Sequence, residues 1–178
     1  MKKTSLRNTK VLAISAFTVA LSVLIGWVCK SYLTFGDGSV RLTFENIPII
    51  LSGIWFGPAV GLAVGASSDV ISALLSGYSI NPIITVGSAF VGVVSGVLSS
   101  YIIKEKKGFL SYLIISVCAH TVGSVIIKSY GLWLYGYAVL MQVRIPLYIV
   151  ISVTEAYIIY IISKNTGVRS GIERLLKK

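Results

Sequence analysis

The sequence predicts an all-α membrane protein with six transmembrane helices and with both termini in the cytoplasm. Hydrophobic residues make up 55% of the 178-residue chain and charged residues only 12%, and the mean hydropathy of +0.86 is far above that of water-soluble domains. Apolar runs close to the ~20 residues that cross a bilayer recur along the whole chain. We therefore expect residues 1–178 to form one integral membrane domain.

Clustered basic residues set the expected topology. Of the 16 lysines and arginines, 12 fall into three groups, at residues 2–10, 104–107 and 164–178. The positive-inside rule places all three groups in the cytoplasm. The chain must therefore cross the membrane an even number of times between one group and the next.

The first expected helix covers residues 11–29. Its apolar stretch is longer than the core of a secretory signal and no small-residue cleavage pattern follows, so we expect it to be retained. The next apolar block, residues 44–76, is too short for two full spans. Gly57 suits a helix end and Pro58 a first helical turn, so we expect a short second helix over 44–56, broken from a third over 58–76.

The remaining helices are expected at residues 82–103, 109–128 and 137–163. A shortened, interrupted helix is tolerated where protein covers its free backbone groups, and such breaks are typical of substrate sites in transporters. Cys29 and Cys118 lie in apolar surroundings without metal-binding or disulfide spacing, so we expect inert thiols and no metal site.

Small residues recur at helical spacing on two helices. Ala16 and Ala20 in the first helix, and Gly61 and Gly65 in the third, have the four-residue spacing that lets another helix approach closely. This pattern predicts either packing inside the bundle or a groove for a separate membrane subunit.

Ionisable side chains lie within the expected spans. Asp69 is in the third helix, His120 and Lys128 share a face of the fifth, and Arg144 and Glu155 share a face of the sixth. Charges in lipid are costly unless paired or hydrated, so we expect a cavity, open to the outside, that holds a ligand. Two alternatives stay open: an Asp69–Arg144 salt bridge, and a His120–Glu155 pair that only holds helices together.

Aromatic side chains gather near the expected outer ends of the helices, beside several of these charges. Such rings are typical of a head-group belt, but their coincidence with charges indicates a flat aromatic ligand with a hydrogen-bond donor edge and an anionic end. The candidate ligand-binding residues are Arg41, Asp69, Tyr78, Asn81, His120, Lys128, Tyr130, Trp133, Tyr137 and Arg144.

The sequence contains no GxxxxGK[ST], HExxH or GxSxG motif. We therefore expect a transport subunit without its own ATPase, rather than an enzyme, with no cofactor and no nucleic-acid partner. One alternative is a membrane-embedded enzyme acting on a lipid or prenyl substrate, with Asp69, His120 and Glu155 converging as acid and base groups. The other is a self-sufficient secondary transporter.

The six-helix layout, Ala16 with Ala20, and the stretch RLTFENIPIILSGIWFGPAVGLAVGASSDVIS resemble the S components of energy-coupling factor (ECF) vitamin transporters. The stretch KSYGLWLYG, followed by Arg144, favours the folate-specific type over pantothenate, pyridoxine or riboflavin-like vitamins. The resemblance implies a high-affinity folate-binding subunit of a bacterial plasma membrane, which captures substrate outside and delivers it by tilting.

The resemblance also implies partners and residue roles. The partners are a transmembrane coupling subunit, which Ala16 and Ala20 would meet, and two cytoplasmic ATPases. With folate as the ligand, Asp69 or Asn81 is expected at the pterin edge and the tyrosines and tryptophan at its faces. The glutamate carboxylates are expected to meet the basic residues Arg41, Lys128 and Arg144.

Overall fold

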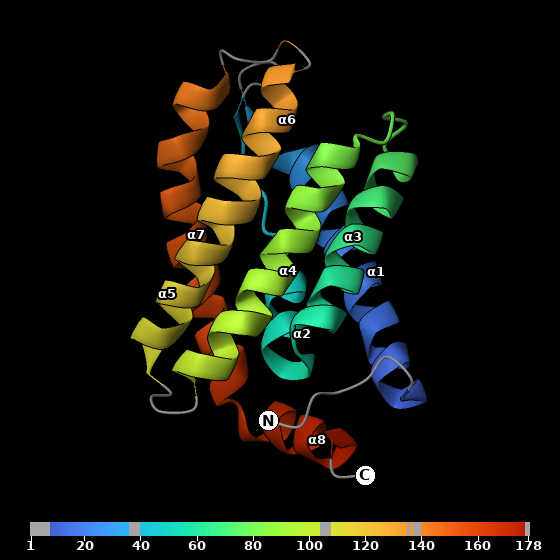
Figure 1. The fold of residues 1–178 in the computed structure, drawn as a ribbon, viewed down its shortest axis with the longest axis vertical. Coiled ribbons are helices and arrows are strands. Elements are labelled where there is room, and N and C mark those ends of the chain that lie inside the picture. Colours follow the sequence, from blue (N-terminus) through green and yellow to red (C-terminus); the bar gives the residue numbers. More distant parts are fainter. Residues whose placement is uncertain (1–7, 36–39, 104–107, 135, 137–139, 177–178) are drawn as a thin grey trace.

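The computed structural model describes residues 8–35, 40–103, 108–134, 136 and 140–176. Its helices stand side by side in one bundle, and a short helix lies across one end (Figure 1). Within the described part of the chain, five helices are long and apolar enough to cross a membrane, and one shorter apolar helix accompanies them. The predicted all-α membrane fold is confirmed.

The first helix, α1 (Thr9–Tyr32), begins after Asn8, whose side chain caps it by accepting a hydrogen bond from the Lys10 amide. Two short strands follow, β1 (Thr34–Phe35) and β2 (Val40–Arg41), which pair antiparallel. The helix prediction did not include this small hairpin, which lies between α1 and α2.

The break between the second and third helices falls where it was predicted. The helix α2 (Asn46–Phe56) ends at Gly57, whose φ of 97° is in the left-handed region that favours glycine, and α3 (Pro58–Leu75) starts directly at Pro58. Nearly all of α2 is buried, against α1, α3, α4 and α7. Protein therefore covers the free backbone groups at the ends of this short helix.

The helix α4 (Pro82–Ile102) packs closely along α3. A Cβ added at Gly61 would collide with the Gly92 backbone, and one added at Gly65 would collide with the Ser88 backbone. The small-residue stripe of α3 therefore serves packing inside the bundle, which was one of the two predicted uses.

The fifth span is a continuous helix that is longer than expected. It comprises α5 (Phe109–Ala119), the π-helical segment η1 (His120–Lys128) and α6 (Ser129–Leu134). The span thus continues six residues past the predicted end at residue 128 and carries the predicted aromatic residues of α6 on a helix instead of a loop.

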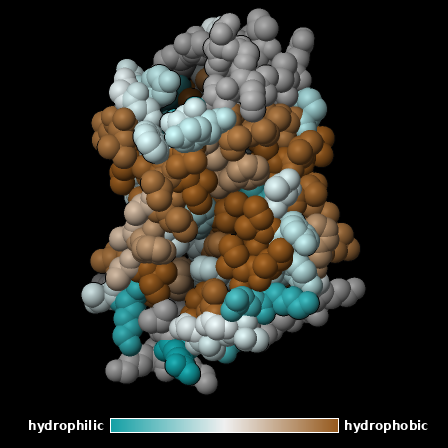
Figure 2. Space-filling view, turned by 180° about the vertical axis from the view of Figure 1, so that it is seen from behind, coloured by the Kyte–Doolittle hydropathy of each residue, from teal (hydrophilic) through white to brown (hydrophobic). Residues whose placement is uncertain are grey.

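The last span is α7 (Leu140–Lys164), and α8 (Thr166–Leu176) follows it. The sequence did not predict α8, and the expected first residues of the sixth helix, 137–139, lie outside the described residues. The helix α1 begins, and α7 ends, at the same end of the bundle (Figure 1), as an even number of crossings requires. Figure 2 shows hydrophobic side chains over the middle of the molecule and hydrophilic ones gathered below them.

Candidate functional site

The polar face of η1 points into the protein. His120 is 1% exposed, Ser124 is fully buried and Lys128 is 7% exposed. The four-residue spacing was expected to align these side chains, and they do share the buried side of this segment. A buried row of this kind, inside a membrane bundle, is a marker of function.

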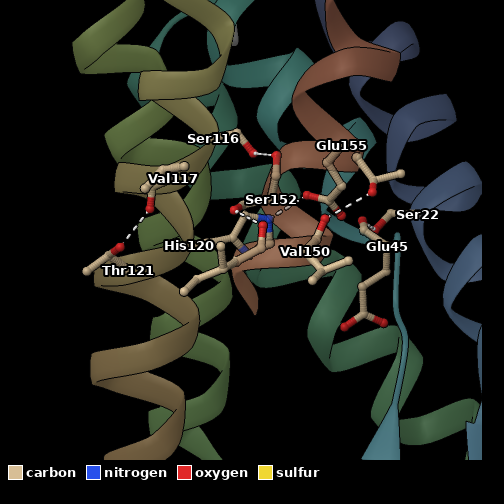
Figure 3. Close-up of polar contacts among 11 residues, drawn as sticks. Ser22, Glu45, Ser116, Val117, His120, Thr121, Val150, Ser152 and Glu155 are labelled. Carbon is tan, nitrogen blue, oxygen red and sulfur yellow. Dashed lines mark hydrogen bonds and ion pairs between the residues drawn. The ribbon is translucent and has the colours of Figure 1, made fainter. Parts of the chain in front are cut away.

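His120 forms a direct pair with Glu155 of α7. The distance between His120 Nε2 and Glu155 Oε2 is 2.5 Å, and the glutamate is fully buried (Figure 3). The Tyr148 ring lies beside the imidazole, with 5.9 Å between ring centroids. Of the possibilities left open by the sequence, the His120–Glu155 pair is therefore formed.

The same cluster ties α1, α2, α5 and α7 together. Ser116 donates a hydrogen bond of 3.0 Å to the Ser152 carbonyl, next to the pair. Ser22 of α1 donates one of 2.6 Å to the carbonyl of Glu45, the residue before α2 (Figure 3). The pair thus lies among hydrogen bonds that join neighbouring helices (Figure 3).

Several polar atoms of this cluster are buried without a hydrogen-bond partner among the described residues. They are His120 Nδ1, Ser124 Oγ and Glu155 Oε1. Leaving such an atom unsatisfied costs about 1–3 kcal/mol, so native proteins usually complete it with water, an ion or a ligand. The cluster can therefore both donate and accept hydrogen bonds to a bound molecule.

Lys128 is the last residue of this polar face, directly before α6. Its side chain runs along Gly87 of α4, where an added Cβ would stand 2.6 Å from Lys128 Cγ and 2.7 Å from the Gly123 carbonyl. In the portion of the chain that the structure describes, no carboxylate forms a salt bridge with Lys128. A nearly buried cation in this setting suits an anionic ligand group.

Asp69, expected either at a ligand or in a salt bridge, is hydrogen-bonded to the neighbouring helix. It accepts hydrogen bonds from Thr85 Oγ1 at 2.7 Å and Ser88 Oγ at 3.1 Å, both on α4. Asn81 also uses its side-chain oxygen, which caps α4 by accepting from the amides of residues 83 and 84. Asp69 and Asn81, the residues predicted to bind the donor edge of the ligand, thus lie along the α3–α4 contact.

The aromatic candidates occupy exposed positions. Tyr130 and Trp133 on α6 stack with 6.0 Å between ring centroids, and each is 54% exposed. Tyr78 is also exposed, and Lys30 Nζ lies 5.8 Å from its ring centroid. The side chains of Arg41 and Arg144, and all of Tyr137, lie outside the described residues.

Sequence reasoning left Lys30 and Glu155 off the list of candidate binding residues. Lys30 Nζ donates to Ser72 Oγ at 3.0 Å and to Ser76 Oγ at 2.7 Å, joining α1 to α3. The four-residue spacing of these two serines was the signal that could have indicated Lys30. Glu155 was recognised only as a packing or catalytic candidate.

Ala16 and Ala20 do not pack inside the bundle. Both are exposed and line a groove of about 820 Å³ between α1 and α3. Its walls are almost entirely apolar and include Leu24, Trp27 and Ile71. The small-residue stripe of α1 is thus open at the protein surface, unlike that of α3.

Comparison with known proteins agrees with this architecture. A family model described as ECF transporter, substrate-specific component matches residues 10–166. The folate transporter FolT of Clostridium novyi (strain NT) is 30% identical over 70 residues, 39% of this chain and 38% of that protein. An uncharacterised MG098 homolog of Mycoplasma pneumoniae (strain ATCC 29342 / M129 / Subtype 1) is 25% identical over 113 residues, 60% of this chain and 24% of that protein.

The matched regions span well under half the length of either relative. The family match, in contrast, covers nearly the whole chain. This multi-pass membrane protein therefore belongs to the family of substrate-specific components of ECF transporters.

Proposed function

We propose that this protein is the high-affinity substrate-binding subunit of an ATP-driven vitamin uptake transporter in a bacterial plasma membrane, and that it binds folate or a related pterin. The buried polar face of η1, with Lys128 at its outer end and the His120–Glu155 pair deeper inside, is the observation that carries this proposal. Family membership and the partial likeness to a folate transporter support it.

Folate combines a flat pterin, an aromatic ring and an anionic glutamate. The glutamate carboxylates are matched by Lys128, together with Arg41 and Arg144. The stacked rings of α6, with Tyr78 and Tyr137, offer aromatic faces for the middle of the ligand. Asp69 or Asn81 meets the pterin edge, since a carboxylate has about four lone-pair positions and two hydroxyls leave Asp69 with acceptor capacity.

Purification of the full chain from bacterial cells tests the ligand class directly. The absorption spectrum and mass of any small molecule that co-purifies should be those of a pterin, and titration calorimetry with folate should then give a dissociation constant. A different chromophore or mass, together with no heat on folate addition, would indicate that the ligand is another vitamin.

The Lys128→Met variant should weaken folate binding about 100-fold, or ~3 kcal/mol. The substitution removes the nearly buried charge that is proposed to pair with the anionic end of folate. The affinity for a pterin that lacks the glutamate chain should fall much less in this variant. Lys164→Met, at the opposite end of the protein, is the matched control. Equal losses for folate and for the shortened pterin would contradict the role of Lys128.

The proposed partners are a transmembrane coupling subunit and two cytoplasmic ATPases, with tilting of this subunit as the delivery step. On this proposal the purified protein alone, in vesicles, binds substrate without accumulating it, whereas a secondary transporter would accumulate it. The enzyme alternative needs Asp69, His120 and Glu155 to converge, but Asp69 bonds to hydroxyls of α4 while His120 bonds to Glu155.

Filling the α1–α3 groove tests the docking role of Ala16 and Ala20. Ala20→Trp should lower folate uptake by the complete transporter at least tenfold and reduce co-purification of the coupling subunit, because the indole blocks close helix approach. Folate binding by the variant should not change. Ala13→Trp is the control, since Ala13 is exposed on the same helix but does not line the groove; equal effects of the two variants would reject the docking role.

A further inference from the structure

The helix α8 lies across the end of the bundle instead of along it (Figure 1). The chain changes direction at Asn165, which caps the start of α8. Its side-chain oxygen accepts hydrogen bonds from the amides of Gly167 at 2.9 Å and Val168 at 3.3 Å. The last transmembrane helix ends one residue earlier, at Lys164. The helix α8 therefore turns across the bundle directly where the last apolar span ends.

The two sides of α8 differ in chemistry. Ile172 packs on the hydrophobic core of the bundle, whereas Ser170, Glu173 and Arg174 are exposed. Ile172 thus fastens α8 to the bundle, while the polar side chains described on this helix are exposed. An amphipathic helix anchored in this way presents its polar side chains in the plane of the lipid head groups.

The charge of this segment is strongly one-sided. From residue 164 to residue 178 the chain contains five basic residues and a single acidic one, Glu173. Lys164 Nζ lies 5.7 Å from the centroid of the Tyr160 ring, and tyrosine beside lysine is typical of the membrane–water interface. Basic clusters immediately after a transmembrane helix attract anionic lipids, and the attraction of neighbouring charges adds up.

We propose that α8, together with Lys164, is an interfacial helix that binds the head groups of anionic phospholipids in the cytoplasmic leaflet. Two observations favour lipid over an acidic protein surface as the occupant. The charges begin at the last residue of a membrane span, and α8 runs across the end of the bundle at that level. This inference is independent of which vitamin the protein binds.

Native mass spectrometry of the full chain in detergent, titrated with phosphatidylglycerol or phosphatidylcholine, tests the proposal. The unchanged protein should retain phosphatidylglycerol at least fivefold better than phosphatidylcholine. Combined replacement of Lys164, Arg169 and Arg174 by glutamine should remove most of this preference. Increasing the salt concentration before the measurement should weaken it in the unchanged protein, because exposed charges are screened.

A matched control replaces Lys104, Lys106 and Lys107 with glutamine, which removes the same charge from another basic group. This control should keep most of the lipid preference. Thermal unfolding of both triple variants, close to that of the unchanged protein, establishes that they are folded. The proposal is overturned by equal retention of the two lipids, by an unchanged preference in the α8 variant, or by equal losses in both variants.

Discussion

Replacing His120 with alanine should destabilise the protein by about 3–5 kcal/mol, one of the largest effects that we expect from a single substitution. The change leaves Glu155 fully buried and removes the group that lies 2.5 Å from its carboxylate. An uncompensated buried carboxylate must then be accommodated in the middle of a membrane bundle. Denaturant unfolding of the purified protein in micelles, without ligand, measures the loss.

Combining His120→Leu with Glu155→Leu should be much less damaging than His120→Ala alone. Replacing both members of a buried pair by apolar groups removes the desolvation cost together with the attraction. Ser116→Ala is the control, since it removes a single neutral hydrogen bond, to the Ser152 carbonyl, and should cost about 1 kcal/mol. If the two leucine substitutions instead add their separate costs, the pair contributes no coupling to stability.

A further variant, Glu155→Gln, separates a role of the pair in the fold from contact with the ligand. Glu155→Gln keeps the size of the side chain and a hydrogen-bond partner for His120, but changes what Oε1 can offer to a guest molecule. If the unpartnered atoms of the cluster face the ligand, this variant should weaken binding more than it lowers stability. A loss of stability without a loss of affinity would limit the pair to a role in packing.

The parts of the fold that were predicted correctly are those that the backbone preferences of individual residues determine. Gly57 and Pro58 mark the break between α2 and α3 because each residue has a backbone preference of its own. The π-helical segment η1 was missed because no local pattern in residues 120–128 marks it; in the structure, Gly123 of this segment lies directly against Gly87 and Val91 of α4. The tail helix α8 was missed because the basic residues of the tail outweigh its few apolar positions.

For the candidate site, the sequence predicted how deep a side chain lies along its helix but not which neighbouring helix it meets. Counting residues along a helix gives the depth of a side chain, so His120 and Glu155 were expected near the same level, where they do meet. Which helix face meets which neighbour depends on packing that a single sequence does not contain. The sequence therefore did not indicate that Asp69 meets Thr85 and Ser88 of α4.

The backbone contact between Gly92 of α4 and Gly61 of α3 gives the second large prediction. Gly92→Ala should reduce stability by about 3 kcal/mol or more, because the new Cβ would collide with the carbonyl of Gly61 across the α3–α4 contact. Backbone atoms cannot rotate away as a flexible side chain can, so the two helices would have to separate. Separation would also strain the hydrogen bonds that Asp69 accepts from α4.

Gly171→Ala is the matched control for this substitution. Gly171 lies in α8, where an added Cβ meets nothing within 4 Å, and alanine is the better helix former. Thermal unfolding in micelles should therefore show a large decrease for Gly92→Ala and no decrease for Gly171→Ala. Because Asp69 lies on α3 and Asn81 caps α4, folate affinity should fall with Gly92→Ala as well. Equal unfolding temperatures for the two variants would mean that the α3–α4 contact is looser than the structure places it.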